Sequence, residues 1–171
     1  MPKGNCHIWS ATLAIGWLAA VIAFSLAPSA FAQSKEDAAV HEALTKYSAA
    51  IERANLEAIG KLWANDESVI VIENGHANYG WADYRDHHLG PELKAMKNTK
   101  MNFTDIKVRL AGDTAWVTFK YTISADLKDR HVEGNSLATA VLEKRDGRWL
   151  IVHWHSSSPR RPPAANPAKP N

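Results

Sequence analysis

Apolar side chains recur every three or four residues along the segment that begins near position 34. The members of this stripe are Val40, Leu44, Tyr47 and Ile51. Their spacing is typical of an amphipathic helix, which we expect to run from Ser34 to about Arg53. Asn55 can cap a second, short helix that ends at Trp63, because its side chain can accept a hydrogen bond from the first turn. The pattern therefore predicts two helices before the first strand.

A run of β-branched residues follows and predicts a buried strand over residues 68–73. This strand ends at the turn dipeptide Asn74-Gly75, which leaves Glu73 at its exit. Gly80 then opens a third helical segment. Its inward candidates, one turn apart, are Trp81, then Tyr84 or Arg85, and then His88. Gly90-Pro91 predicts a break or kink there, followed by a short helix from Pro91 to about Lys97, because proline lacks a backbone N–H and biases Gly90 away from the α-helical region.

Three longer strands are predicted after this segment, over residues 101–110, 115–125 and 131–143. In the second of them, one face carries Ala115, Val117, Phe119, Tyr121 and Ile123. The opposite face carries Trp116, Thr118, Lys120 and Thr122. Helices first and an antiparallel meander afterwards predict an α+β fold, with the helices packed on one face of a curved sheet.

The last part of the meander is the most informative stretch. Asp146-Gly147 favours a tight hairpin turn, because these residues readily adopt the positive φ angles that such a turn requires. The strand that follows alternates, and one face carries Trp149, Ile151, His153, His155 and Ser157. We expect this face to point toward the helices. It would then bring two histidines, about 7 Å apart, into a cavity between the sheet and the helices.

The opposite face of the sheet predicts how the chain assembles. Its members in the two strands are Trp116, Thr118, Lys120, Leu150, Val152 and Trp154. If the other face packs against the helices, this surface is too apolar to lie in water. We therefore expect a homodimer that forms through the sheet.

Residues 1–32 have the pattern of a secretory signal peptide. Lys3 precedes a long uncharged apolar stretch, and Ala30-Phe31-Ala32 is a small-x-small cleavage site. A retained membrane anchor is the alternative, which Pro28 and the well-placed cleavage site disfavour. We expect a periplasmic or secreted protein that begins at Gln33 and has no membrane contact after cleavage.

The composition of the remaining chain narrows the function further. Cys6 is the only cysteine and lies in the signal peptide, so the mature chain would use neither disulfides nor thiolate chemistry. Residues 33–171 contain 19 Lys and Arg against 18 Asp and Glu, a formal charge of +1. These charges are interspersed, so a nucleic-acid-binding surface is not indicated. We expect one domain over residues 33–158 and a disordered, Pro-rich tail over residues 159–171.

The order of elements and the sequence Arg-Asp-Gly-Arg-Trp-Leu-Ile-Val-His-Trp-His-Ser-Ser-Ser at residues 145–158 resemble the nuclear transport factor 2-like superfamily. Within it, the chain is most similar to the SnoaL-like bacterial domains and to the association domain of calcium/calmodulin-dependent protein kinase II. The similarity covers residues 35–158, and its most specific positions are Trp149, Val152, His153, His155 and Ser157. The resemblance implies a cone-shaped fold with a cavity between the concave face of the sheet and the helices. It also implies a dimer through the sheet.

Two functional patterns of the superfamily are incomplete in this sequence. The association domain lines its cavity with arginines that bind small carboxylates. This chain retains one of them at Arg85, whereas the other aligned positions carry Tyr121 and Ala140. The ketosteroid isomerases of the superfamily use an acidic base with an acidic and a tyrosyl partner for the oxyanion, and that set cannot be placed on this sequence.

The candidate catalytic residues are His153, His155 and Tyr121. An imidazole titrates near neutral pH, and a neighbouring carboxylate can fix its tautomer, which suits acid–base chemistry. The candidate ligand-binding residues are Trp63, Glu73, Tyr84, Arg85, His88, Phe119 and Trp149. As the simpler alternative, the histidines belong to a hydrogen-bonded cavity wall, most aromatic residues are core, and Arg85 pairs with a nearby carboxylate.

A metal site is a further alternative. His153 and His155 could present two nitrogens to one ion, and His76, His88 or Glu73 could complete the site. Known zinc motifs add a third ligand at a fixed sequence spacing, and this sequence contains none. We therefore expect neither a metal nor another cofactor.

Three classes of function are compatible with the sequence. The first is a module that binds a small, mostly apolar or aromatic molecule in the cavity. The second is an acid–base enzyme of the isomerase, lyase or hydrolase type. The third is a non-catalytic oligomerisation domain. The expected partners are a small-molecule ligand and a second copy of the chain, and all three classes stay open at this point.

Overall fold

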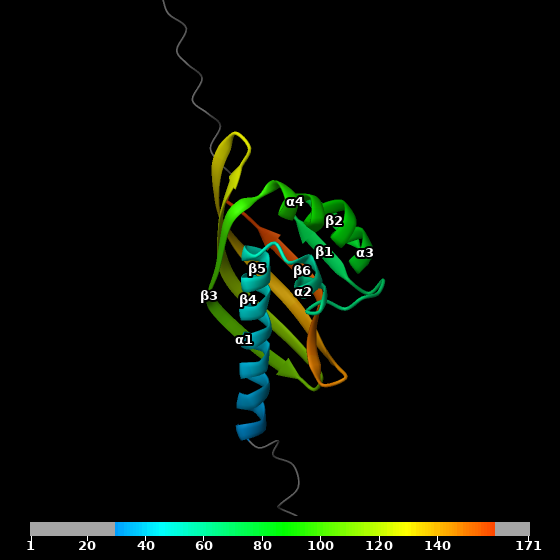
Figure 1. The fold of residues 1–171 in the computed structure, drawn as a ribbon. Coiled ribbons are helices and arrows are strands. Elements are labelled where there is room, and N and C mark those ends of the chain that lie inside the picture. Colours follow the sequence, from blue (N-terminus) through cyan, green and yellow to red (C-terminus); the bar gives the residue numbers. More distant parts are fainter. Residues whose placement is uncertain (1–29, 160–171) are drawn as a thin grey trace, which may run out of the picture.

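The computed structural model describes residues 30–159 (Figure 1). The predicted signal peptide and the predicted tail after Pro159 therefore lie almost wholly outside the described residues. Within the described part, no helix is long and apolar enough to cross a membrane.

The two predicted N-terminal helices are confirmed. Helix α1 spans Ala30–Glu52, and α2 spans Leu56–Gly60. The apolar stripe of α1 faces the sheet, where Val40, Leu44, Tyr47 and Ile51 are all buried. Asn55 caps α2, because its side chain accepts a hydrogen bond of 2.9 Å from the Ala58 N–H. Helix α1 begins at Ala30, before the predicted start at Ser34, whereas the packing of its stripe and the cap of α2 agree with the sequence pattern.

A single sheet of six strands forms the second layer. The strands are β1 (Ile70–Glu73), β2 (His76–Tyr79), β3 (Lys97–Ala111), β4 (Thr114–Leu127), β5 (Arg130–Arg145) and β6 (Arg148–Ser157). Their order is β2-β1-β6-β5-β4-β3, and every pair is antiparallel except β1 and β6. The turn before β6 has positive φ at both Asp146 and Gly147, as the sequence predicted. The α+β fold is confirmed, whereas β2 was not predicted.

The parallel pairing of β1 with β6 joins distant parts of the chain. Val71 lies opposite Trp154, and Glu73 lies opposite Ser156. Paired residues in neighbouring strands point to the same face of a sheet. This pairing therefore places the exit of β1 beside the end of β6, on the face that α1 covers.

A helical segment of three parts follows β2. It consists of α3 (Trp81–Tyr84), a π-helical turn η1 (Arg85–Leu89) and α4 (Gly90–Ala95), which lie beside the β1–β2 hairpin (Figure 1). The expected break at Gly90-Pro91 is wrong, since Gly90 is helical and its N–H bonds to the carbonyl of Arg85, five residues back. A Cβ at Gly90 would lie 2.7 Å from that carbonyl oxygen. Glycine thus allows the wide turn to form where proline prevents ordinary α-helical bonding.

A β-bulge in β6 changes the faces of the two histidines. Val141 pairs with His153, but the next residue, Leu142, pairs with Ile151, so Val152 is an extra residue. The alternation therefore reverses at this point. Trp149 and Ile151 face the helices as predicted, whereas His153 and His155 face the opposite, outer side of the sheet. The prediction that both histidines point into the cavity is wrong, because strict alternation fails at a bulge.

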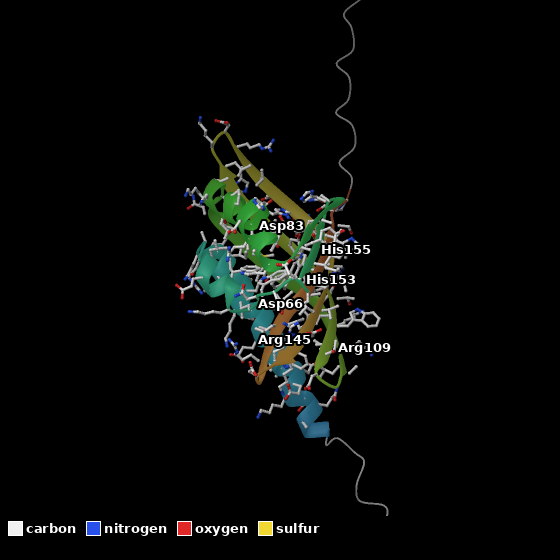
Figure 2. All side chains as sticks on the ribbon, turned by 90° about the vertical axis from the view of Figure 1, so that its right-hand side faces the viewer. Asp66, Asp83, Arg109, Arg145, His153 and His155 are labelled. Atoms are coloured by element: carbon white, nitrogen blue, oxygen red, sulfur yellow. The ribbon has the colours of Figure 1, made fainter. Side chains whose placement is uncertain are left out.

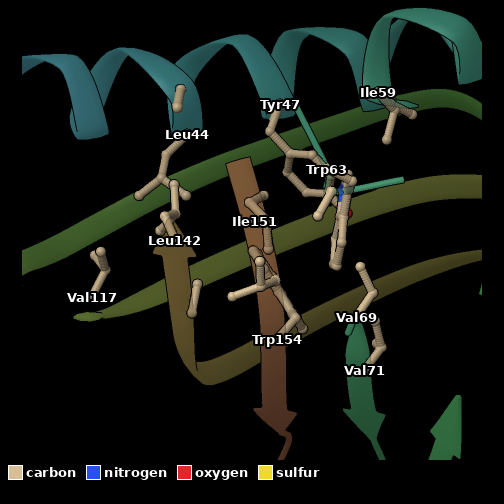
Figure 3. Packing of buried hydrophobic residues seen from close by; sticks show 14 of the residues in the cluster. Leu44, Tyr47, Ile59, Trp63, Val69, Val71, Val117, Leu142, Ile151 and Trp154 are labelled. Atoms are coloured by element: carbon tan, nitrogen blue, oxygen red, sulfur yellow. The ribbon is translucent and has the colours of Figure 1, made fainter. Parts of the chain in front are cut away.

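The same bulge turns Trp154 into the core. Its side chain is 2% exposed and its ring lies 5.0 Å from that of Phe119 and 5.4 Å from that of Tyr47 (Figure 3). Leu150 and Val152 are also buried. Trp154 was predicted to belong to the dimer face, but it lies on the inner face of the sheet. Figure 3 shows the core between α1, α2 and the sheet, to which Leu44, Ile59, Val117 and Leu142 contribute.

Candidate functional site

One cavity lies between the inner face of the sheet and the helices. Its volume is about 220 Å³. The polar and aromatic residues that line it are Tyr47, Glu73, Asn74, Tyr84, His88, Glu92, Tyr121, Ser136, Trp154 and Ser158. Four of these, Glu73, Tyr84, His88 and Tyr121, are residues for which the sequence predicted a role in the cavity. The fold brings them together from β1, α3, η1 and β4.

Glu73 occupies the inner wall at the exit of β1. Its side chain is 15% exposed. The Ser156 hydroxyl donates to Glu73 Oε1 at 3.1 Å, and the Tyr121 hydroxyl donates to Ser156 Oγ at 3.3 Å. Burial raises the pKa of the Glu73 carboxyl above its ordinary value, and the charge of Glu92 adds to this. The carboxyl therefore keeps its proton to a higher pH than an exposed glutamate does.

His88 reaches the same carboxylate from the π-helical turn. Its Nε2 lies 3.6 Å from Glu73 Oε2 and 3.4 Å from Glu92 Oε1. The imidazole is largely covered, with 19% of its side chain exposed. The positive charge of a protonated His88 would lower the pKa of Glu73 and so opposes the effect of burial. The two groups are thus placed to share or exchange a proton.

Two residues that the sequence analysis missed hold the other side of the imidazole. Asn78 is 3% exposed on β2, and its side-chain NH₂ donates to Asp83 Oδ2 at 2.9 Å. The carbonyl oxygen of Asn78 must then be the atom that lies 2.9 Å from His88 Nδ1. Because a carbonyl oxygen only accepts, Nδ1 carries the proton. The free lone pair or second proton of His88 is therefore directed at the carboxylates.

These contacts form one continuous polar network. In order, its members are Tyr121, Ser156, Glu73, His88, Asn78 and Asp83. Asp83 at the outer end has a lowered pKa because of its hydrogen bonds to Asn78 and His87. It is therefore a fixed carboxylate, whereas Glu73 at the inner end has a raised pKa. Two carboxyl groups with opposite shifts on one line are typical of acid–base sites.

Trp154 adds an unsatisfied donor to the cavity wall. Its indole Nε1 is buried and has no hydrogen-bond partner among the described residues. A hydrogen-bonding interaction with this indole nevertheless lowers the pKa of Glu73, so the N–H points toward that carboxylate, although the two groups lie outside ordinary hydrogen-bond geometry. A buried donor without a partner is costly in a folded protein. A bound molecule with an acceptor would satisfy it.

The tyrosines of the cavity are neutral hydroxyl donors. Burial raises the pKa of Tyr84 and of Tyr121 above the ordinary value. The same holds for Tyr47, which the sequence analysis assigned to the helix stripe alone. None of the three therefore ionises near neutral pH.

The structure places the other predicted ligand-binding residues away from the cavity. Trp63 stacks on Trp81 in the core with ring centroids 5.6 Å apart, and Phe119 is buried in the core against Phe103. Trp149 lies toward α1, where its indole N–H donates to Glu36 at 2.9 Å. Arg85 forms an ion pair of 2.6 Å with Asp86. Arg85 therefore follows the simpler alternative of a carboxylate partner.

His153 and His155 lie on the outer face of β6 (Figure 2). Burial and the charge of His155 lower the pKa of His153. Because these side chains point away from Glu73 and His88, the alternative metal site that combined them is wrong. Among residues 32–159, no group of three His, Cys, Asp or Glu side chains is arranged to hold a metal ion.

Comparison with protein families gives one match. A family model described as a SnoaL-like domain matches residues 40–161. This range contains every member of the polar network. Among curated proteins, an F-box protein of Arabidopsis thaliana, SKIP8, is 29% identical over 118 residues. The match covers 66% of this chain and 46% of that protein, so the chain spans about half the length of this relative.

Comparison with solved structures agrees with the family match. A candidate dehydratase of the nuclear transport factor 2-like family from Streptomyces avermitilis superposes with a TM-score of 0.69 at 21% identity, over 75% of this chain and 99% of that chain. A candidate association domain of calcium/calmodulin-dependent protein kinase II from Xanthomonas campestris gives 0.60 at 25% identity, over 73% and 86%. The predicted superfamily and fold are thereby confirmed.

Proposed function

The chain belongs to the SnoaL-like domain family, and from this premise we propose that it binds a small molecule in the cavity and acts on it by acid–base chemistry. The observation that carries the proposal is the polar network, which runs from Tyr121 through Glu73 and His88 to Asp83. A fold alone does not imply a reaction, because SnoaL-like and related domains include enzymes of several kinds. The proposal therefore rests on this site.

The positions of Glu73 and His88 suggest their roles. Glu73 in its ionised form is the base that removes a proton from the bound molecule, and its raised pKa makes it a stronger base than an exposed carboxylate. His88 exchanges that proton through Nε2, while Asn78 holds the ring through Nδ1. Return of the proton to another atom gives an isomerase. Loss of a leaving group after proton removal gives a lyase.

Trp154 and Tyr121 are the candidate partners of the negative charge that develops on the substrate. The buried Trp154 N–H lies beside Glu73 without a hydrogen bond of ordinary geometry, and Tyr121 is a neutral hydroxyl whose proton, donated to Ser156 in this structure, can turn toward a ligand. Donors that face the developing charge in a site sheltered from water stabilise a transition state strongly. Of the three residues that the sequence analysis proposed as catalytic, we retain Tyr121.

Proton exchange offers a test that does not require the natural substrate to be known. A panel of small carbonyl compounds, neutral and charged, is incubated with the protein in D₂O, and the loss of α-proton signals is followed by NMR. We expect catalysed exchange for at least one compound. Removal of a general base typically lowers the rate by about 10²–10⁴-fold, which is the loss expected for Glu73→Gln.

Glu57→Gln is the matched control, because Glu57 is an exposed glutamate paired with Lys61 on α2. It should exchange the same compounds at the wild-type rate. Equal exchange by wild-type protein and Glu73→Gln would show that Glu73 is not the base. No exchange with any compound of the panel would count against the acid–base part of the proposal.

Assembly through the outer face of the sheet is a second proposal. The exposed large hydrophobic side chains among the described residues are Ile70, Tyr79, Trp116 and Leu137. The pairing registers place Tyr79, Ile70, His153, Val141 and Trp116 in one row across five strands. A row of mostly apolar side chains on an open sheet is typical of an interface. We propose that two copies of the chain pair through this face.

A charge within this face should weaken the pairing. Leu137 is 60% exposed, so Leu137→Glu leaves the monomer folded while it places a carboxylate in the interface. Sedimentation analysis should show dimerisation weakened by roughly tenfold or more, a change of about 1.4 kcal/mol. Lys128→Glu, in the turn between β4 and β5, is the control and should pair as the wild type does. A wild-type protein that stays monomeric at high concentration would exclude the interface.

A further inference from the structure

We propose that the cavity selects a small organic cation, an ammonium compound that also carries a hydrogen-bond acceptor. This inference rests on the proposed function, because it names the substrate class of the same site. It follows from the charge of the lining residues, from their aromatic character and from the unpaired donor in the wall.

The charge of the cavity lining is negative. Glu73 and Glu92 contribute two carboxylates, and His88 is the one basic side chain. None of the described residues that line the cavity is Lys or Arg. With both carboxylates ionised, the lining carries a net charge of −1 or −2, depending on the proton of His88. Such a lining attracts a cation and disfavours an anion.

Nearby cationic groups are turned away from the cavity. Arg85 precedes His88 on the same helical turn, but it forms an ion pair of 2.6 Å with Asp86 at the surface. His87 faces Asp83 at 2.9 Å, also on the exposed side. Of these three basic side chains, His88 is therefore the one that faces the carboxylates of the cavity.

Aromatic rings and methionines form much of the remaining wall, beside the polar residues Asn74, Ser136 and Ser158. Tyr47, Tyr84, Tyr121 and Trp154 line the cavity together with Met96 and Met101. Tyrosine and tryptophan rings attract ammonium groups through their π faces, and desolvation strengthens this attraction. Aromatic rings beside carboxylates therefore suit an alkylated ammonium better than a small hydrated ion.

The Trp154 indole specifies a second feature of the ligand. Its N–H is buried in the cavity wall beside Glu73 and makes no hydrogen bond of ordinary geometry to a described residue. A cation alone cannot accept from it. A hydroxyl or carbonyl oxygen attached to the same small molecule can. The volume of about 220 Å³ is below the ~300–1,000 Å³ that sites for drug-sized ligands occupy, so the molecule is small.

Three probes of equal shape separate charge from size. Choline carries a quaternary nitrogen and a hydroxyl. The second probe is its uncharged analogue, an alcohol with a carbon atom in place of that nitrogen. The third probe is the carboxylate formed by oxidation of this alcohol, which carries a negative charge. Calorimetry at about pH 8, where ordinary carboxylates are ionised, should show choline binding roughly tenfold or more tightly than the alcohol. The carboxylate should bind more weakly than either.

Variants then locate the binding. Glu73→Gln should reduce the preference for choline over the alcohol at least about threefold, since it removes one of the two carboxylates. Glu57→Gln, on the exposed side of α2, should retain the full preference. Circular dichroism verifies that each variant is folded. A full preference in Glu73→Gln would place choline outside the cavity and overturn the inference.

The two proposals fail in different ways. If the alcohol binds as tightly as choline, or the carboxylate binds best, the cavity does not select cations, while catalysed proton exchange would still support the proposed function. If none of the three probes binds but exchange is observed, the inference again fails alone. If choline binds as expected but no compound exchanges, cation selection stands and the acid–base chemistry does not.

Discussion

The two faces of β6 differ in how firmly their polar groups are held. On the inner face, Ser156 hydrogen-bonds to Glu73 within the polar network, and the buried Trp154 indole lies beside the same carboxylate. On the outer face, His155 is exposed and forms no hydrogen bond or ion pair that binds it to another described side chain. Alternating residues of one strand thus line the cavity on one side and face solvent on the other.

This contrast shows which surroundings a titratable residue needs in order to serve in acid–base chemistry. The outer histidines are close in sequence and chemically suited to catalysis, but the contact that holds them is a hydrogen bond between the backbone of Ile70 and His153, and no described carboxylate pairs with either ring. Glu73 and His88 come from different elements, and the fold surrounds them with groups that fix one ring nitrogen and raise one carboxyl pKa. Position within a constrained environment therefore matters more than the presence of two histidines.

The largest expected effect is on the free energy of unfolding, and it separates two tryptophans that lie on opposite faces of the sheet. Trp154 is 2% exposed in the core, and Trp116 is 56% exposed on the outer face. Loss of a buried tryptophan typically costs about 3–5 kcal/mol, because it removes apolar contacts and leaves a void. Trp154→Ala should therefore lower the free energy of unfolding in urea by this amount, whereas Trp116→Ala should change that of the monomer by less than about 0.5 kcal/mol. Similar losses in both variants would contradict the assignment of faces.

The pH dependence of stability should differ in sign between the faces. Glu73 keeps its proton to a higher pH in the folded chain than in the unfolded chain. Its contribution is fully present below its ordinary pKa of 4.5 and is lost as the pH rises through the raised value. Glu73→Gln should therefore gain stability over the wild type on going from acid to neutral pH, as measured by denaturant unfolding across that range.

Asp105 is the outer-face control for this measurement. Its hydrogen bond and ion pair with Lys120 lower its pKa. The stability it contributes is therefore present above its ordinary value of 3.8 and is lost as the pH falls through the lowered value. Asp105→Asn should lose stability relative to the wild type near neutral pH and not in acid. The same sign in Asp105→Asn and Glu73→Gln would refute the contrast.

The smallest effect is expected for the outer histidines. His155→Ala should change the free energy of unfolding by less than about 0.5 kcal/mol, because the residue is exposed. It should leave proton exchange in the cavity at the wild-type rate. NMR titration should show a higher pKa for His153, since the charge of His155 is one of the causes that lower it. Loss of exchange in folded His155→Ala protein would restore this residue to the site.

Much of the fold was predictable because local patterns and packing agree. The apolar stripe of α1, the Asn55 cap and the Asp146-Gly147 turn each follow from residues within a few positions of one another. The short strand β2 was missed because His76–Tyr79 alternates weakly and depends on pairing with β1 for its stability. The helix across Gly90-Pro91 was missed because the π-helical turn was not considered.

The site was predictable only in part for a related reason. Glu73, Tyr84, His88 and Tyr121 lie in regular elements before or after clear turn signals, so their faces could be assigned. One extra residue, Val152, reversed the assignment of everything after it in β6. Asn78 and Asp83 belong to segments that read as loop or surface helix. An asparagine buried beside a histidine carries no local signal that could have revealed it.

The parallel pairing of β1 and β6 has a consequence for the order of folding. Glu73 and Ser156 are 83 residues apart in the sequence, so their contact requires the closure of a long loop. Contacts of such long range form slowly. A ribosome completes β6 after the other strands, and until that strand is inserted the inner face of the sheet lacks Trp154 and Ser156. The proposed site is therefore completed at the end of folding, and a chain that stops before Trp154 would lack two residues that lie beside Glu73.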